Sequence, residues 1–74
     1  MIFYIEKQTI SKEWNDNLSK YLKGDLLAVF DSLPARSREG MILGTARSHG
    51  IPSWLARSVL RLLVMEGFLK VTEQ

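Results

Sequence analysis

An amphipathic segment between residues 52 and 66 constrains the fold of this chain more than any other part of the sequence. At about 100° per residue, a helix drawn through this segment separates two faces. The first face is aliphatic and comprises Leu55, Ala56, Val59, Leu60, Leu62 and Leu63. The second face carries Arg57 and Arg61 one turn apart, with Ser53, Trp54 and Ser58 beside them. We therefore expect a helix over about residues 52–66 that packs on a small core and presents two guanidinium groups.

Signals on both sides of this helix indicate a fold that mixes helices and strands. Gly50-Ile51-Pro52 is typical of a turn, and Glu66-Gly67 is typical of a helix end. Residues 68–72 alternate in polarity and residues 2–6 are rich in β-forming side chains, so each segment predicts a short strand. Because a lone strand leaves backbone donors unpaired, we expect these two terminal strands to form an antiparallel ribbon.

Two helices are predicted directly after the first strand. The first helix begins near Ser11, a candidate N-cap, and ends at Gly24 after about three turns. Its apolar side chains recur at helical spacing and are Trp14, Leu18, Tyr21 and Leu22. Asp25 is a candidate cap for a second helix over residues 26–33, which Pro34 ends because proline removes a backbone donor.

A third helix is predicted over about residues 38–48, after a turn at residues 34–37 in which Ser37 is a candidate cap. Gly40 and Gly44 each weaken this helix by up to about 1 kcal/mol relative to alanine, and Gly44 could permit close approach of another helix. The prediction is thus one α+β domain of 74 residues, mostly helical, with four helices and a two-stranded ribbon.

Composition argues against several classes of protein. Apolar residues make up 46% of the chain, and the absence of cysteine excludes disulfides and cysteine-based zinc sites. No apolar run approaches the roughly 18 residues of a membrane span, and the first residues do not resemble a secretory signal. We therefore expect a cytoplasmic protein without membrane contact. The chain has no nucleotide-binding glycine motif, helical histidine pair or close carboxylate pair, so we expect no catalysis, cofactor or metal.

Positive charge is concentrated in the second half of the chain. Residues 1–33 carry four lysines and five acids, a balance of −1, whereas residues 34–74 carry five arginines and one lysine against three acids, a balance of +3. Arginine binds phosphate and guanine edges in a bidentate way that lysine cannot match. This distribution favours nucleic acid as a partner, although the arginines could also simply form a solvated polar face.

From Ala46 to Val71 the sequence resembles the helix-turn-helix half of winged-helix DNA-binding domains. The matching features are Ala46, the Gly50-Ile51 turn, Leu60 and Leu63 at buried positions, and Glu66-Gly67 followed by Phe68-Leu69. The resemblance implies a regulator-like protein that binds double-stranded DNA through the helix at about residues 52–66. Because one small module offers limited contact area, we expect it to act as a homodimer.

The resemblance also implies which residues contact DNA. Side chains in the first turns of such a helix read the groove, and those of the preceding helix and turn contact phosphates. The groove-facing residues would be Ser53, Trp54, Arg57, Ser58 and Arg61. The phosphate contacts would be Arg47 and His49, with Arg36 and Arg38 as further candidates. A lone histidine such as His49 is also compatible with a purely structural role, and for Trp54 packing on the core is favoured over contact with a partner.

Val64 and Met65 favour a second reading, because they are apolar where winged helices commonly carry charge. They could pack beneath the N-terminal helix through Trp14 and Tyr21, or form a contact between two copies of the chain. The wing also lacks its second strand unless the N-terminal strand supplies it. The alternative is therefore a small protein-binding inhibitor or adaptor on the same frame, such as a mobile-element protein that blocks host machinery. A subunit of a larger nucleoprotein assembly would share features of both.

Overall fold

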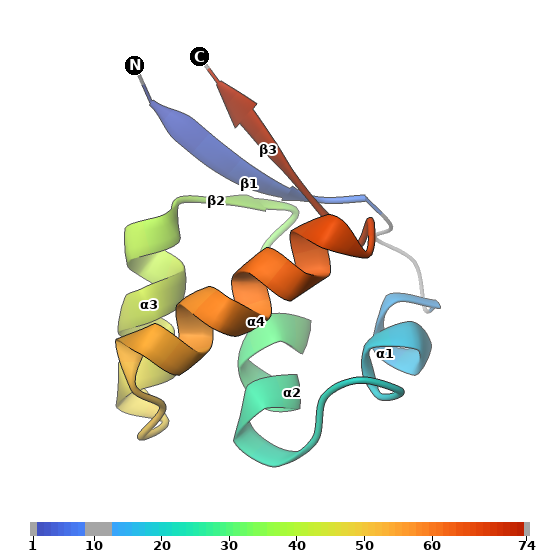
Figure 1. Ribbon diagram of the computed structural model, residues 1–74, viewed down its shortest axis with the longest axis vertical. Coiled ribbons are helices and arrows are strands. Elements are labelled where there is room, and N and C mark those ends of the chain that lie inside the picture. The colour runs from blue at the N-terminus through green and yellow to red at the C-terminus, as the bar shows by residue number, and fades with distance from the viewer. Residues whose placement is uncertain (1, 9–12, 74) are drawn as a thin grey trace.

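The computed structural model describes residues 2–8 and 13–73, and a small antiparallel sheet lies over a layer of helices (Figure 1). The predicted cap Ser11 lies outside the described residues. In chain order the elements are β1 (Phe3–Lys7), α1 (Glu13–Leu18), α2 (Gly24–Asp31), β2 (Arg36–Ser37), α3 (Glu39–Ser48), α4 (Ser53–Met65) and β3 (Leu69–Glu73). The α+β class, the four helices and the pairing of the terminal strands are confirmed.

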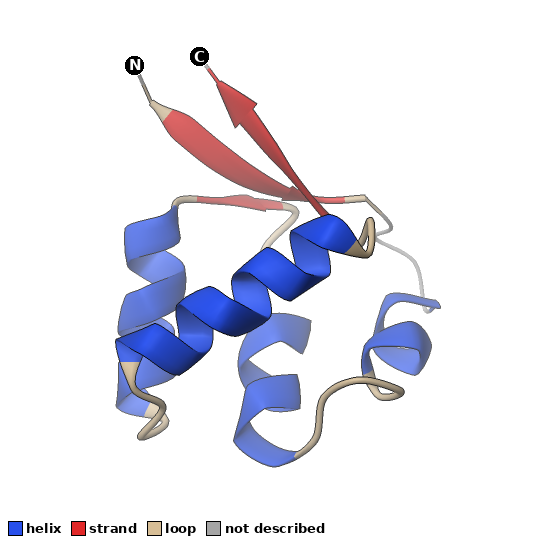
Figure 2. Cartoon of the chain, viewed as in Figure 1, coloured by secondary structure: helices blue, strands red, loops and turns tan. Residues whose placement is uncertain are grey.

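The sheet has three strands in the order β2-β1-β3, so the prediction of a two-stranded ribbon was incomplete (Figure 2). β1 and β3 pair antiparallel over five residues, from Phe3 opposite Glu73 to Lys7 opposite Leu69. The segment predicted as a turn at residues 34–37 instead contributes β2, with Ser37 opposite Ile5. Two residues are too few to show the polar and apolar alternation of a strand, which explains why the sequence did not indicate β2.

Strand alternation gives the sheet two distinct faces. Ile5 and Leu69 are buried against the helices, together with the small side chain of Ser37. The opposite, outer face carries a polar network: the Arg36 guanidinium lies 3.9 Å from the centre of the Tyr4 ring, and Thr72 Oγ1 donates a 2.9 Å hydrogen bond to Glu6 Oε1. The sheet therefore covers the core with one face only.

The core lies between the inner face of the sheet and the helices. Its largest fully buried side chains come from all four helices and are Leu18, Val29, Phe30, Ile42 and Leu63. α4 buries Ala56, Val59, Leu60 and Leu63, which are four of the six residues expected on its apolar face. The other two are only partly covered, with Leu55 half-buried and Leu62 exposed, so the buried stripe of α4 is narrower than the sequence predicts.

The first two helices depart from the prediction at their ends. α1 stops at Leu18 after six residues, and Tyr21 lies in the following turn. Gly24, expected to end α1, begins α2 instead, and the Asp25 side chain makes no cap hydrogen bond because Lys23 is the N-cap residue. α3 likewise begins after Arg38 rather than with a Ser37 cap. Leu22 is buried although it is not helical. Its apolar side chain falls at helical spacing from Leu18, and for that reason the sequence predicted a further helical turn.

Gly50 and Gly44 differ in backbone conformation, and substitution of each by alanine gives a matched stability test. Gly50 has a φ of +77°, which side chains rarely adopt, whereas an added Cβ at Gly44 meets nothing within 4 Å. The expected close approach of a helix at Gly44 is therefore wrong. We predict that Gly50→Ala lowers the free energy of unfolding by about 1–2 kcal/mol, and that Gly44→Ala raises it by about 0.5–1 kcal/mol. Urea unfolding of both variants measures the two effects, and a loss of stability in Gly44→Ala would contradict the open space described there.

Candidate nucleic-acid interface

The two helices of the predicted helix-turn-helix are joined by a tight, hydrogen-bonded turn. The backbone N–H of Ile51 donates to the carbonyl of Ala46 at 2.9 Å, and that of Gly50 donates to Arg47 at 2.9 Å. Pro52 is the N-cap residue of α4, and its carbonyl accepts hydrogen bonds from the backbone of Leu55 and Ala56. Because Ile51 is buried, the turn is anchored to the core and holds α4 at a fixed angle to α3.

Arg57 and Arg61 both lie on the exposed side of α4, as the sequence predicts. Arg57 Nε lies 3.5 Å from Glu39 Oε1 at the start of α3, and both side chains are more than half exposed. Such an exposed pair contributes at most about 1 kcal/mol and leaves the guanidinium available to a stronger anion. Arg61 and the exposed Arg47 of α3 have no acidic partner among the described residues.

Trp54 is 68% exposed in the first turn of α4, so its expected packing on the core is wrong. It lies on the outward side of the helix because the buried stripe begins only at Ala56. Ser58, one turn further on, donates a 3.0 Å hydrogen bond from Oγ to the Trp54 carbonyl. Its hydroxyl therefore binds its own helix here. Ser53, at the beginning of α4, is half-buried.

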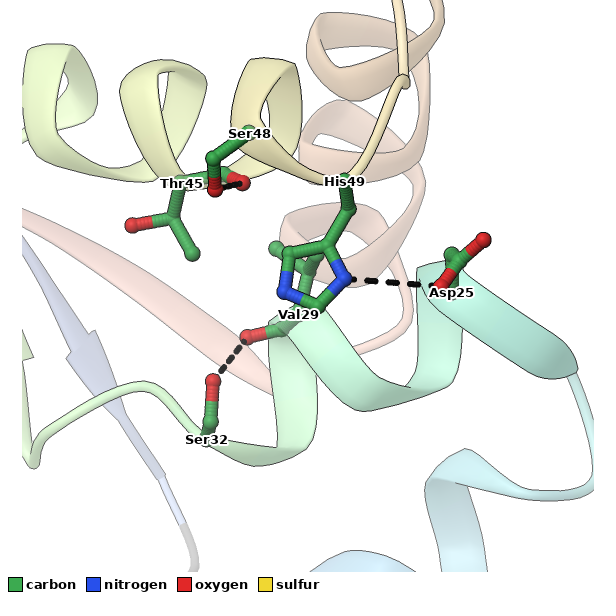
Figure 3. Close-up of polar contacts among 6 residues, drawn as sticks. All are labelled: Asp25, Val29, Ser32, Thr45, Ser48 and His49. Carbon is green, nitrogen blue, oxygen red and sulfur yellow. Dashed lines mark hydrogen bonds and ion pairs between the residues drawn. The ribbon is translucent and has the colours of Figure 1, made fainter.

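His49 follows α3 directly and is directed toward α2 (Figure 3). Its Nδ1 lies 3.4 Å from Asp25 Oδ1, across 24 residues of sequence. The contact links the end of α3 to the first turn of α2. Ser48 at the end of α3 and Ser32 at the other end of α2 each donate a hydrogen bond to a carbonyl of their own helix, Thr45 and Val29 (Figure 3). The structural role left open for this histidine thus has an observed partner, and the Asp25 carboxylate lies beside any anion that His49 could contact.

The two additional phosphate candidates lie in different surroundings. Arg36 belongs to the outer face of the sheet, where it covers the Tyr4 ring and its Nε lies 3.9 Å from Glu6 Oε1. It is therefore on the side of the sheet facing away from the helices and is not grouped with the arginines of α4. Arg38 is exposed at the N-cap of α3, next to Glu39.

Val64 lines a groove of about 470 Å³ between α4 and the inner face of the β1–β3 pair. The groove is lined by Phe3, Ile5, Glu39, Arg57, Leu60, Arg61, Val64 and Val71. Val64 thus packs toward the sheet rather than beneath the N-terminal helix. Trp14 and Tyr21 instead make edge-to-face contacts with Phe68, at centroid distances of 6.1 and 5.4 Å. Met65 is 77% exposed, so no N-terminal element of the described chain covers it.

The groove is a feature that sequence reasoning missed. Its two walls are separated by about fifty residues of chain, because Phe3 and Ile5 lie in β1 and Arg57 and Arg61 in α4. Periodicity within α4 places Arg57 and Arg61 on an exposed face, but only tertiary structure brings them to the edge of an apolar cleft.

Two acids of the N-terminal half differ in position, since Asp16 lies in α1 whereas Asp25 lies beside His49 at the end of α3. Asp16 belongs to α1, which packs mainly on α2 and lies at the opposite end of the helical layer from α3 (Figure 1).

In the described ranges, residues 2–8 and 13–73, no group of three potential ligands is placed to hold a metal ion, and no helix is long and apolar enough to cross a membrane.

Comparison with known proteins finds no matching protein-family model, no matching curated protein and no matching solved structure.

Proposed function

We propose that this protein binds double-stranded DNA, with α4 lying in the major groove as the recognition helix of a winged-helix-like frame. The observation that carries the proposal is the exposure of Arg47, Arg57 and Arg61 on the helix pair α3 and α4, with Glu39 as the only acid paired to any of them in the described chain. Arginine side chains on exposed helices make both phosphate contacts and bidentate contacts to guanine. The proposed place of action is the cytoplasm.

The arrangement of the sheet also supports this proposal. After the proposed recognition helix the sequence predicts only one strand, whereas the wing of a winged helix has two. In the structure, β1 pairs with this strand, β3, along its whole length. In the proposed frame, the N-terminal strand would serve as the second strand of the wing after the recognition helix. The resulting ribbon borders the same groove as Arg57 and Arg61.

A salt titration with a charge-matched control tests the proposal. Neutralising phosphate-binding cations lowers affinity across all sequences and reduces the salt dependence by about one unit of slope per contact. We predict that Arg57→Ala/Arg61→Ala weakens binding to mixed-sequence duplex DNA at least tenfold. We also predict that it lowers the slope of log K against log salt concentration by up to about 2. Fluorescence anisotropy at several salt concentrations measures both quantities.

The control is Lys20→Ala/Lys23→Ala, which removes the same net charge from the exposed turn between α1 and α2. It is expected to change affinity by less than threefold, because these lysines lie outside α3 and α4. Equal losses in the two double variants would mean that overall charge alone governs binding. Undetectable or salt-insensitive binding of the unchanged protein at micromolar concentration would refute the proposal.

A protein partner is the second candidate, and the exposed apolar side chains of α4 favour it. Trp54, Leu62 and Met65 are 68%, 39% and 77% exposed and lie on the outward side of α4. Interfaces between proteins are enriched in tryptophan and methionine, and tryptophan often dominates their affinity. An inhibitor or adaptor would depend on Trp54 and Met65, so Trp54→Ala/Met65→Ala would abolish partner capture while Arg57→Ala/Arg61→Ala would leave it largely intact.

A further inference from the structure

The outer edge of β3 is open in the described part of the chain. β1 lies in the middle of the sheet with β2 on one side and β3 on the other, and β3 pairs with β1 alone. β2 is only two residues long, whereas β3 presents an edge of five residues. An edge of this length is a template for pairing with another strand.

The backbone of β3 indicates which of its residues face this open edge. The carbonyl of Phe68 accepts a 3.0 Å hydrogen bond from the backbone N–H of Gln8, so the polar groups of residue 68 point toward β1. In an antiparallel strand this direction alternates from one residue to the next. Lys70 and Thr72 therefore also point toward β1, and the N–H and C=O groups of Leu69, Val71 and Glu73 point outward.

We propose that the β3 edge is a homodimer interface, in which β3 of two copies pair antiparallel about a two-fold axis through Val71. This register places Val71 opposite Val71 of the second copy, and Leu69 opposite its Glu73. All three outward-pointing residues then form hydrogen-bonded pairs, each of which exchanges two backbone bonds. Moving the axis to Lys70 or Thr72 leaves only two such pairs, so the central register satisfies the most backbone groups.

Side chains favour the same register. With the axis at Val71, Lys70 lies opposite Thr72 of the second copy, and no two like charges face each other across the new ladder. An axis at Lys70 would place two lysines directly opposite, which is destabilising. On the helix side of the sheet, Val71 is 49% exposed and Phe3 on the neighbouring strand is 54% exposed. A second Val71 would cover part of this apolar surface.

A two-fold axis through Val71 runs perpendicular to the sheet, so both helical layers lie on the same side of one continuous six-stranded sheet. The two α4 helices are consequently presented together. Such a dimer would offer two recognition helices to DNA on one face. That consequence rests on the proposed function, whereas the dimer itself does not. Dimerisation is therefore tested without DNA.

Sedimentation equilibrium from micromolar to millimolar concentration is the first test. We expect the average mass to rise toward twice the 8.5 kDa of the single chain. Val71→Pro removes an outward-pointing N–H and leaves the bonds to β1 intact, so it should weaken dimerisation at least tenfold while the circular dichroism spectrum is unchanged. A protein that stays at 8.5 kDa at millimolar concentration would overturn the proposal and leave the edge to a strand of a different protein.

Cysteine cross-linking tests the register and does not depend on the proline variant folding. The chain contains no cysteine, so each variant carries a single thiol. At the proposed axis the two Val71 Cα atoms lie about 5.5 Å apart, within reach of a disulfide. We expect Val71→Cys to form a covalent dimer under mild oxidation at least tenfold faster than Lys70→Cys, whose two copies lie two residues apart along the ladder. Equal rates for the two variants would refute this register.

Discussion

Val29→Asp is expected to lower the free energy of unfolding by about 3–5 kcal/mol. Val29 is completely buried in α2, and no cationic side chain is among the buried residues of the described core that surround it. A carboxylate that is buried without a partner costs about 3–5 kcal/mol. A domain of 74 residues has a total stability of roughly 4–11 kcal/mol at the usual 0.05–0.15 kcal/mol per residue. The substitution thus removes a large part of the stability, and urea unfolding followed by circular dichroism measures the loss.

Ala28→Asp is the matched control, because it places the same side chain one residue earlier on the exposed side of α2. It is expected to cost less than about 1 kcal/mol, mainly through the lower helix propensity of aspartate. A folded Val29→Asp protein with stability similar to that of Ala28→Asp would show that Val29 does not lie in the core.

Leu63→Ala is expected to lower the free energy of unfolding by about 3–5 kcal/mol, because truncation of a buried leucine loses transfer free energy and leaves a cavity. Leu63 has no exposed surface, and it lies in the middle of the buried stripe of α4. Urea unfolding followed by circular dichroism measures the loss. Binding of this variant to DNA or to a protein partner would not test the candidate site, because the substitution disturbs the helix that carries it.

Leu62→Ala provides the control for Leu63→Ala, with the same chemical change in the adjacent residue of the same helix. Leu62 is 39% exposed, so we expect a cost below about 1 kcal/mol. The sequence alone places both leucines on one apolar face, whereas the structure separates them. Equal losses for the two variants would support the broad face expected from the sequence and contradict the observed packing.

The parts of the fold that could be predicted are those determined by local signals. α4 was expected at about residues 52–66 and spans Ser53–Met65, because its periodicity runs for more than three turns between a Gly-Pro turn and Gly67. The terminal strands followed from composition and from the need to pair their backbones. Non-local packing produced the errors: Leu22 is buried in a turn, and Ser37 forms a strand only because Ile5 lies opposite it.

The same division applies to the candidate site. The exposure of Arg57 and Arg61 follows from helical periodicity, and the structure places both on the exposed side of α4. Their surroundings could not be predicted, because Glu39 and the apolar wall of the groove come from distant parts of the chain. The sequence offered Arg36 as a further candidate for phosphate contact. Its position on the outer face of the sheet depends on the pairing of β2 with β1, which has no local signal.

The central position of β1 has a consequence for how the protein is made. β1 is synthesised before both of its neighbours, and Leu69, which lies opposite Lys7, follows it by 62 residues. At about 5–20 residues per second, the ribosome needs roughly 3–12 s to make this stretch. Until then, only the two-residue β2 is available among the described strands to pair with β1. The β3 side of β1 therefore stays unpaired longest, and the three-stranded sheet can close only after β3 has been synthesised.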